Sequence, residues 1–197
     1  MSTSLHLSNV EVFSQPFPYI VSPECLEPEI SRTVLAWLES TAPWQLVEAD
    51  FYEQFECSFW DVELPPTLAF LREHAFLTAM KDRIGELFGV DVSHRVDITA
   101  HKLMSGQRIR LHNDFLPGGE THRLLIQFNR GWADTSGGFL LLFHSADPAD
   151  VHKIFRPIHN SALGFAISAT SYHAVSTIHA GERFTLVYSF YEQPPHE

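Results

Sequence analysis

Four residues in the C-terminal half of the sequence have side chains suited to binding a metal ion and an anion. His112 and Asp114 are separated by one residue, and His173 follows much later in the chain. Two imidazoles and one carboxylate can occupy one face of an octahedral ion, as in non-haem Fe(II) sites, and leave positions open for a co-substrate and O2. Arg183, ten residues after His173, could bind the far carboxylate of a keto-acid. The set is compatible with an iron site.

Strand alternation would bring these side chains to one side of the backbone. Residues two apart on a strand share a face, which groups Arg108, Arg110, His112 and Asp114. The same rule places Arg183 and Thr185 together as a fork for a carboxylate. Each signal is weak alone, because His-x-Asp arises by chance among twelve histidines and arginines commonly form surface salt bridges.

The elements that must position these residues are predicted strands. After Val90 the sequence has period two and β-branched or aromatic character, with turn residues between the segments. The predicted strands are Arg95–Met104, Gln107–His112, His122–Asn129, Gly138–Phe143, Val151–Ile154, Ala162–Ser168, His173–Ile178 and Arg183–Tyr191. Short, evenly spaced strands preceded by helices indicate a jelly roll, a double-stranded β-helix of the cupin type in which two antiparallel sheets enclose a cavity.

The N-terminal part of the sequence predicts helical support for this core. Apolar residues at three-to-four spacing predict helices over about Glu27–Ser40 and Thr67–Phe88, the second with a break near His74. Trp44–Val62 is expected to be a strand or an irregular edge. We therefore expect one mainly β domain over 1–197, with buttressing helices in 1–92 and the jelly roll in 93–193.

Composition excludes several classes of protein. The net charge of −11 argues against nucleic acid as a partner, because such binding requires neutralisation of phosphates. No apolar run is long enough to cross a membrane, and Met1–Val10 lacks the features of a secretory signal. Cys25 and Cys57 are too few for a disulfide framework, so reduced thiols and a cytoplasmic location are expected.

The order of short motifs from about Ile98 to Tyr191 resembles the 2-oxoglutarate- and Fe(II)-dependent oxygenases, in the branch similar to prolyl hydroxylases. The matching segments are 101–106 (HKLMSG), 112–114 (HND), 124–132 (LLIQFNRGW), 137–140 (GGFL), 160–165 (NSALGF), 171–175 (SYHAV) and 183–185 (RFT). The resemblance covers roughly half of the chain, and the other half fits the variable helical support of the family.

This resemblance implies His112, Asp114 and His173 as iron ligands and as the catalytic centre. It also implies Arg183 for the distal carboxylate of 2-oxoglutarate, with Thr185 as a second contact. The expected reaction uses Fe(II), 2-oxoglutarate and O2 to hydroxylate an unactivated C–H bond, with release of succinate and CO2. The aspartate argues against halogenation, for which related enzymes carry Ala or Gly at that position.

The substrate is less well defined by the sequence. Many relatives carry a tyrosine near the position of Leu103, and its absence leaves the contacts on that side of the co-substrate open. Candidate substrate contacts are Arg108, Arg110, Arg123 and Gln127. An amino acid, a peptide residue or a related biosynthetic intermediate fits best. Nucleic-acid demethylases of the superfamily carry a second arginine where this chain has Ser189.

One alternative comes from a different class of protein. A cupin-like metal-binding protein could act as a sensor, a binding module or an isomerase on the same fold. Arg183 discriminates between the two hypotheses, because a protein that is not an oxygenase has no need for a buried cation directed at a keto-acid.

Overall fold

The computed structural model describes residues 5–7 and 9–193. Within these residues the chain forms two α-helices, α1 (Pro28–Ser40) and α2 (His74–Phe88), and two short 3-10 helices, η1 (Ala69–Arg72) and η2 (Asp134–Ser136). The strands are β1 (Glu11–Phe13), β2 (Tyr19–Ser22), β3 (Gln45–Ala49), β4 (Tyr52–Ser58), β5 (Val92–Leu103), β6 (Ile109–His112), β7 (His122–Phe128), β8 (Leu140–Phe143), β9 (Val151–Phe155), β10 (Ala162–Ala166), β11 (His173–Val175) and β12 (Arg183–Glu192).

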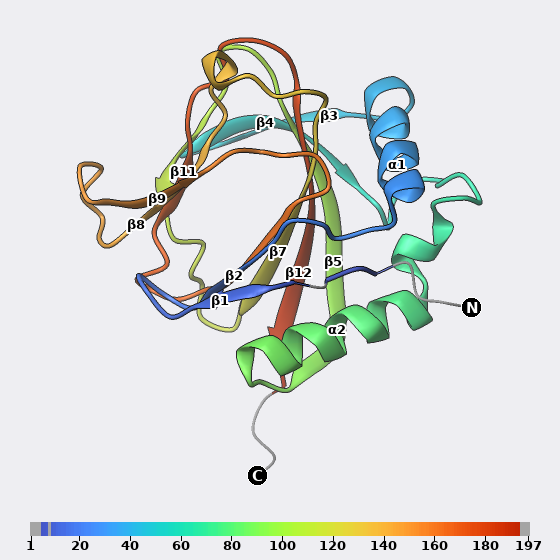
Figure 1. Cartoon of the computed structure of the whole chain (residues 1–197), viewed down its shortest axis with the longest axis horizontal. Coiled ribbons are helices and arrows are strands. Elements are labelled where there is room, and N and C mark those ends of the chain that lie inside the picture. Colours follow the sequence, from blue (N-terminus) through green and yellow to red (C-terminus); the bar gives the residue numbers. More distant parts are fainter. Residues whose placement is uncertain (1–4, 8, 194–197) are drawn as a thin grey trace.

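The strands form two facing layers that are joined through β4. The hydrogen-bonded order is β1-β2-β10-β7-β12-β5-β4-β6-β11-β8-β9, with β3 paired to β4. Strand β4 pairs with β5 and also, through Tyr52 and Ile109, with β6. The layers therefore fold over on each other, as Figure 1 shows. On the opposite side, the Tyr19 ring of β2 packs against Phe155 of β9 at 6.0 Å. This arrangement confirms the expected jelly roll.

Alternation along β12 divides the interior into two regions. Phe184, Leu186 and Tyr188 belong to a core between the larger sheet and the helices, whereas Arg183, Thr185 and other odd-numbered positions face the space between the layers. The two helices lie against the outside of the larger sheet (Figure 1). The apolar side chains of α1 and the buried side chains of α2 pack into the core between the helices and this sheet. Burying a large apolar side chain contributes roughly 1.5–3 kcal/mol. The helices thus hold rigid the strand that carries Arg183.

Most of the predicted elements are confirmed. All eight predicted strands form with shifts of a few residues at their ends, and the second helix is interrupted at Glu73, beside the expected break. Gly89 ends that helix with a φ of 70°. Strands β3 and β4 lie in Trp44–Val62, which was expected to be a strand or an irregular edge, whereas β1 and β2 were not predicted. Strands β1 and β2 are short, and β2 pairs with the distant β10, so no local pattern reveals them.

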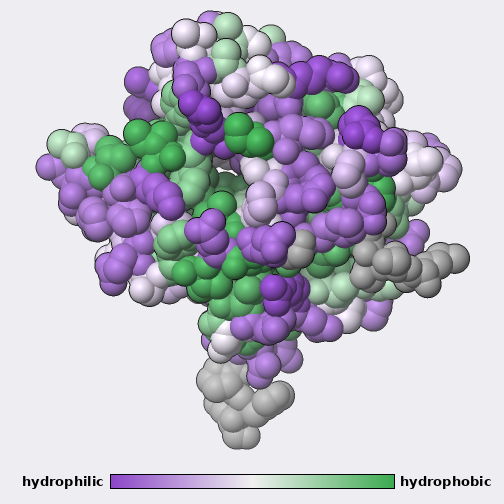
Figure 2. Space-filling model, viewed as in Figure 1, coloured by the Kyte–Doolittle hydropathy of each residue, from purple (hydrophilic) through white to green (hydrophobic). Residues whose placement is uncertain are grey.

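The surface is largely polar. Hydrophilic residues cover much of the face shown in Figure 2, in keeping with the net charge of −11. Within the described ranges, no helix has the length and apolar character needed to cross a membrane.

Candidate active site

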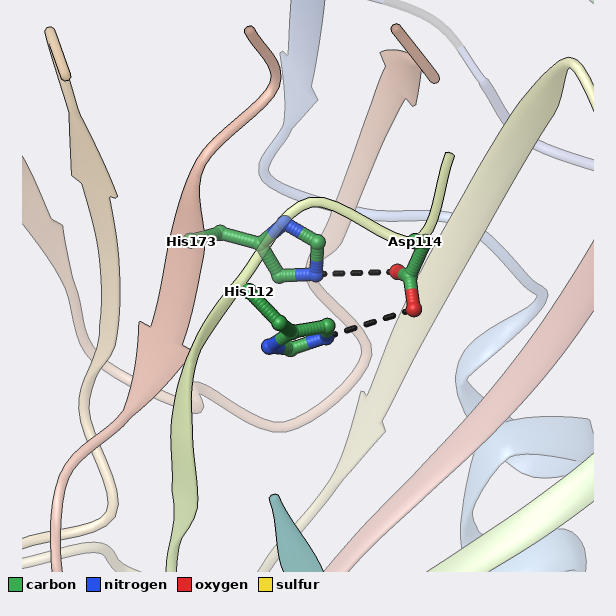
Figure 3. Close-up of side chains that lie close together, drawn as sticks. All are labelled: His112, Asp114 and His173. Carbon is green, nitrogen blue, oxygen red and sulfur yellow. Dashed lines mark ion pairs between the residues drawn. The ribbon is translucent and has the colours of Figure 1, made fainter. Parts of the chain in front are cut away.

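Three potential metal ligands converge between the two layers of the sheet. The Nε2 atoms of His112 and His173 lie 3.3 Å and 3.1 Å from the two carboxylate oxygens of Asp114 (Figure 3). One potential ligand atom from each of the three residues lies within 4.8 Å of the other two. Lone pairs gathered so closely repel one another unless protons or a cation lie among them. The donor set of two imidazoles and one carboxylate is the one that suits Fe(II).

Backbone contacts fix the orientation of both histidine rings. The Nδ1 atom of His112 lies 2.8 Å from the carbonyl oxygen of Arg110, and Nδ1 of His173 lies 2.8 Å from that of Ser171. A carbonyl only accepts, so each Nδ1 carries the proton. Each Nε2 is then left to face Asp114, as in histidines that ligate metals through Nε2.

The segments that carry the three residues are tied together. His112 and His173 are cross-strand partners of β6 and β11. Between His112 and Asp114, Asn113 donates to the carbonyl of Ala169 at 3.1 Å, and its own carbonyl accepts from Ser171 at 3.0 Å. These bonds fix the end of β6 to the turn before β11 and hold the three donor groups close together.

The Asp114 carboxylate is strongly stabilised in its ionised form. Burial alone would raise its pKa, but His112 and His173, which donate to the carboxylate from Nε2 when their rings are protonated, and the charge of Arg123 outweigh that effect and hold the pKa well below its usual range. Its backbone has a φ of 58°, a left-handed conformation that Asp tolerates better than most residues. The residue is therefore a permanent anion at the end of β6.

Arg183 is a buried cation without an anionic partner among the described residues. Its side chain is 3% exposed, and Nη1 donates to the Thr185 hydroxyl at 2.8 Å. That hydroxyl donates in turn to Oε1 of Gln127 at 3.1 Å, whereas Nε of Arg183 has no partner. Burial lowers the pKa of Arg183 to about 10. An unpaired buried charge destabilises the fold, so this position is suited to an anion that arrives from outside.

One cavity of about 280 Å³ contains both groups. The triad and Arg183 line it, together with apolar side chains from five strands. These apolar residues are Ile109, Leu125, Leu140, Val175 and Val187. At the far end, Gly138 leaves room for Arg183, because a Cβ there would lie 3.1 Å from Cδ of the arginine. A metal ion and an elongated anion can thus share one chamber.

A family comparison identifies the chemistry of this chamber. Residues 98–190 match the family model described as the 2OG-Fe(II) oxygenase superfamily, and this segment includes the triad and Arg183. Over these 93 of its 197 residues the chain is similar to that superfamily. The protein is therefore a 2-oxoglutarate-dependent dioxygenase that uses Fe(II) and O2, as the resemblance in the sequence predicted. The donor set and the unpaired arginine fit this metal and this co-substrate.

Solved structures share the fold of this oxygenase at low sequence identity. A Pseudomonas putida prolyl-4-hydroxylase matches with a TM-score of 0.71 and 14% identity, over 89% of this chain and 93% of the other. A Trichoplax adhaerens prolyl hydroxylase, in complex with a peptide fragment of the hypoxia inducible factor, gives 0.72 and 14%, over 88% and 83%. A Burkholderia pseudomallei 2OG-Fe(II) oxygenase gives 0.61 and 17%, over 88% and 85%. A search of curated proteins returned no match.

Two of the four candidate substrate residues lie elsewhere in the oxygenase than alternation predicts. His112 pairs with His173, and Ile109 pairs with Val175. Between these two pairs β6 advances by three residues and β11 by two, so β6 has one extra residue, a bulge. This bulge shifts the alternation, and Ile109 lines the cavity with His112. The prediction that Arg108 and Arg110 share the His112 face was wrong. Both are exposed and line an outer groove that also includes Phe51 and Tyr52.

The other two candidates are engaged within the protein. Arg123 lines the cavity and donates from Nη1 to Oδ2 of Asp114 at 2.5 Å. Its Nε donates to Glu120 at 3.2 Å, and its Nη2 contacts the same carboxylate. Gln127 is buried behind Thr185 and lies at the Arg183 end. Both side chains already bond to other residues, which leaves them few free polar atoms for a substrate.

Sequence reasoning overlooked the cavity-lining residues of β4 and β5. Tyr52, Gln54 and Glu56 line the chamber from β4, and His101 lines it from β5. Burial, then the charges of Arg123 and Arg183, lower the pKa of His101 to about 3, so its imidazole is neutral. Period-two patterning was the available signal, but Trp44–Val62 could not be assigned to a sheet from its own sequence.

Proposed function

We propose that this oxygenase hydroxylates an unactivated C–H bond of an amino acid, a peptide residue or a related biosynthetic intermediate. One O2 molecule and one 2-oxoglutarate are consumed for each hydroxyl group formed, and succinate and CO2 are released. The observation that carries the proposal is the unpaired, buried Arg183 in the same chamber as the triad. A protein that only binds a metal has no use for this costly cation.

In this proposal His112, Asp114 and His173 hold the iron. Each imidazole would bind through Nε2, because its Nδ1 proton is held by a backbone carbonyl. Bound Fe(II) supplies the reductive activation of O2 that couples decarboxylation of the keto-acid to C–H hydroxylation. The three residues hold one side of the ion and leave the remaining positions to the co-substrate and O2.

Arg183 would bind the distal carboxylate of 2-oxoglutarate. The Thr185 hydroxyl accepts from Arg183 and donates to Gln127, so both of its roles are already in use. We therefore assign Thr185 and Gln127 to orientation of the guanidinium, with Thr185 free to contact the carboxylate only after rotation. Charge-assisted bonds of this kind are about twice as strong as neutral ones.

Arg123 is proposed to position Asp114 for the metal. Its contact with Oδ2 leaves Oδ1 as the freer oxygen of the carboxylate, which favours binding through a single atom. Glu120 neutralises the added positive charge and holds the arginine in place. The apolar residues in part of the lining lower the local polarity, which strengthens these interactions.

The outer groove with Arg108 and Arg110 remains a candidate for the flanking part of a substrate. It shares Phe51 and Tyr52 with the cavity, so a chain that enters the chamber could extend along it. The Trichoplax adhaerens relative is described in complex with a peptide, which supports this reading. We propose no nucleic-acid partner, since the charge of −11 opposes one, and a cytoplasmic location, since Cys25 and Cys57 are free.

The test is optical and then chemical. Under anaerobic conditions, Fe(II) and 2-oxoglutarate should give a visible metal-to-ligand absorption band in the wild type. His173→Ala and Arg183→Met should lose it, whereas a substitution at the exposed Arg130 should keep it. Succinate release would then be screened against amino acids and peptides, with products identified by mass. If the wild type shows no band, the proposal is wrong.

A further inference from the structure

Three side chains of β4 place hydrogen-bond acceptors on one wall of the chamber. Tyr52, Gln54 and Glu56, which we call the β4 acceptor cluster, all line the cavity. Nε2 of Gln54 donates to Oε1 of Glu56 at 2.8 Å. Burial, and then the charge and hydrogen bonding of Glu56, raise the pKa of Tyr52. The Glu56 carboxylate therefore receives neutral donors only.

The amide oxygen of Gln54 is a buried acceptor without a donor. Gln54 is 2% exposed, and no described group donates to its Oε1. The orientation of the amide is fixed, because only its NH2 group can donate to Glu56. A buried, unsatisfied polar atom costs about 1–3 kcal/mol. 2-Oxoglutarate carries only acceptor oxygens when ionised, so it cannot supply the missing donor.

The positive charges in the chamber are all assigned to other groups, which leaves none to balance the Glu56 carboxylate. Asp114 and Glu120 both pair with Arg123, and Arg183 is reserved for the co-substrate in the proposed function. A divalent ion and the dianionic keto-acid cancel each other. In the part of the chain that the structure describes, no salt bridge includes Glu56, so the loaded chamber retains one negative charge on this wall.

We propose that Glu56 and Oε1 of Gln54 bind a cationic group of the substrate, an ammonium or a guanidinium. Such a group supplies several N–H donors and the missing positive charge together. The substrate would accordingly be a basic amino acid, an amine or a peptide residue with a basic side chain. This inference rests on the proposed function for the assignment of Arg183 and the metal.

The experiment uses two pairs of small probes, each a cation and a neutral compound of similar size. The wild-type protein loaded with Co(II) and 2-oxoglutarate is titrated with n-butylammonium or n-butanol, and separately with n-butylguanidinium or n-butylurea, and ligand-observed NMR gives each Kd. At least one cation should bind about 10-fold more tightly than its neutral counterpart. Glu56→Gln should remove this preference, and Gln54→Met should weaken it several-fold. Comparison of the two pairs separates ammonium from guanidinium.

The matched control is Glu53→Gln, because Glu53 lies on the same strand but is exposed and bonds to Gln107 outside the chamber. It should leave the preference for cations intact. Equal binding of charged and neutral probes, no binding of either cation, or a preference that survives Glu56→Gln would each overturn the inference. Loss of the Fe(II)–2-oxoglutarate band in Glu56→Gln would instead assign the residue to the co-substrate and also overturn it. If the wild-type protein itself shows no such band, the proposed function is contradicted.

Discussion

Replacing Arg183 by methionine should stabilise the protein while abolishing co-substrate binding. Burial shifts the pKa of Arg183 from 12.5 to about 10, which corresponds to a cost of about 3 kcal/mol for keeping it charged in the folded state. Methionine removes this cost but also the bond to Thr185, worth about 1 kcal/mol. The net gain of about 2 kcal/mol should raise Tm by roughly 4–8 °C for a chain of this size.

Thermal unfolding of the metal-free protein measures this gain. The cost is complete below pH 10, where folded and unfolded chains both carry the charged arginine, and it decreases above pH 10 as the folded chain releases its proton. The Tm difference between variant and wild type should therefore narrow from pH 9 to pH 11. Added to the protein already saturated with Fe(II) and kept anaerobic, an excess of 2-oxoglutarate should raise Tm further in the wild type only.

The control is Arg130→Met, which removes an exposed arginine paired with Glu39. Exposed ion pairs contribute roughly 0–1 kcal/mol, so its Tm should change little, and in the destabilising direction. If Arg183→Met instead lowers Tm by several degrees, the arginine is a structural element with a partner, and the reasoning about an anion site fails.

Three further predictions concern the site and the core around it. Arg123→Met should weaken Fe(II) or Co(II) binding by about 10–100-fold in a metal titration, and an unchanged affinity would remove its positioning role. Gly138→Ala should lower the unfolding free energy in urea by more than about 2 kcal/mol, because a Cβ at φ 67° would lie 2.6 Å from Ile178. Gly118→Ala, at φ 75° in open space, should cost only about 1 kcal/mol, and equal losses would contradict the packing argument. Burial raises the pKa of Cys57 to about 11, so it should resist a thiol reagent at pH 8 until the protein is unfolded, and prompt labelling of the native protein would refute this.

Local patterns predicted the residues whose geometry depends on one strand. The period-two pattern of β12 placed Arg183 and Thr185 on one face, and the short spacing of His112 and Asp114 implied proximity. Partnership with His173 was suggested by residue type alone and was strengthened by the resemblance to a family, because no local pattern links residues so far apart. The eight core strands followed from their composition and turns.

The errors share one physical cause, which is pairing between distant segments. The bulge opposite His173 depends on how β11 pairs with β6, and it reverses the side on which Arg108 and Arg110 lie. Similarly, Glu56 reaches the chamber because β4 pairs with both β5 and β6. A single sequence carries no direct record of either pairing.

Because the backbone of Asp114 is left-handed, substitutions at this position differ in how well the new residue tolerates the conformation. Glutamate would preserve the charge, but a longer side chain at a φ of 58° is disfavoured, whereas asparagine adopts this conformation readily. Shape and charge can therefore be separated by a single substitution: Asp114→Asn keeps the turn and removes only the anion. The position thus combines two separate requirements, a left-handed backbone and a negative charge, and aspartate meets both.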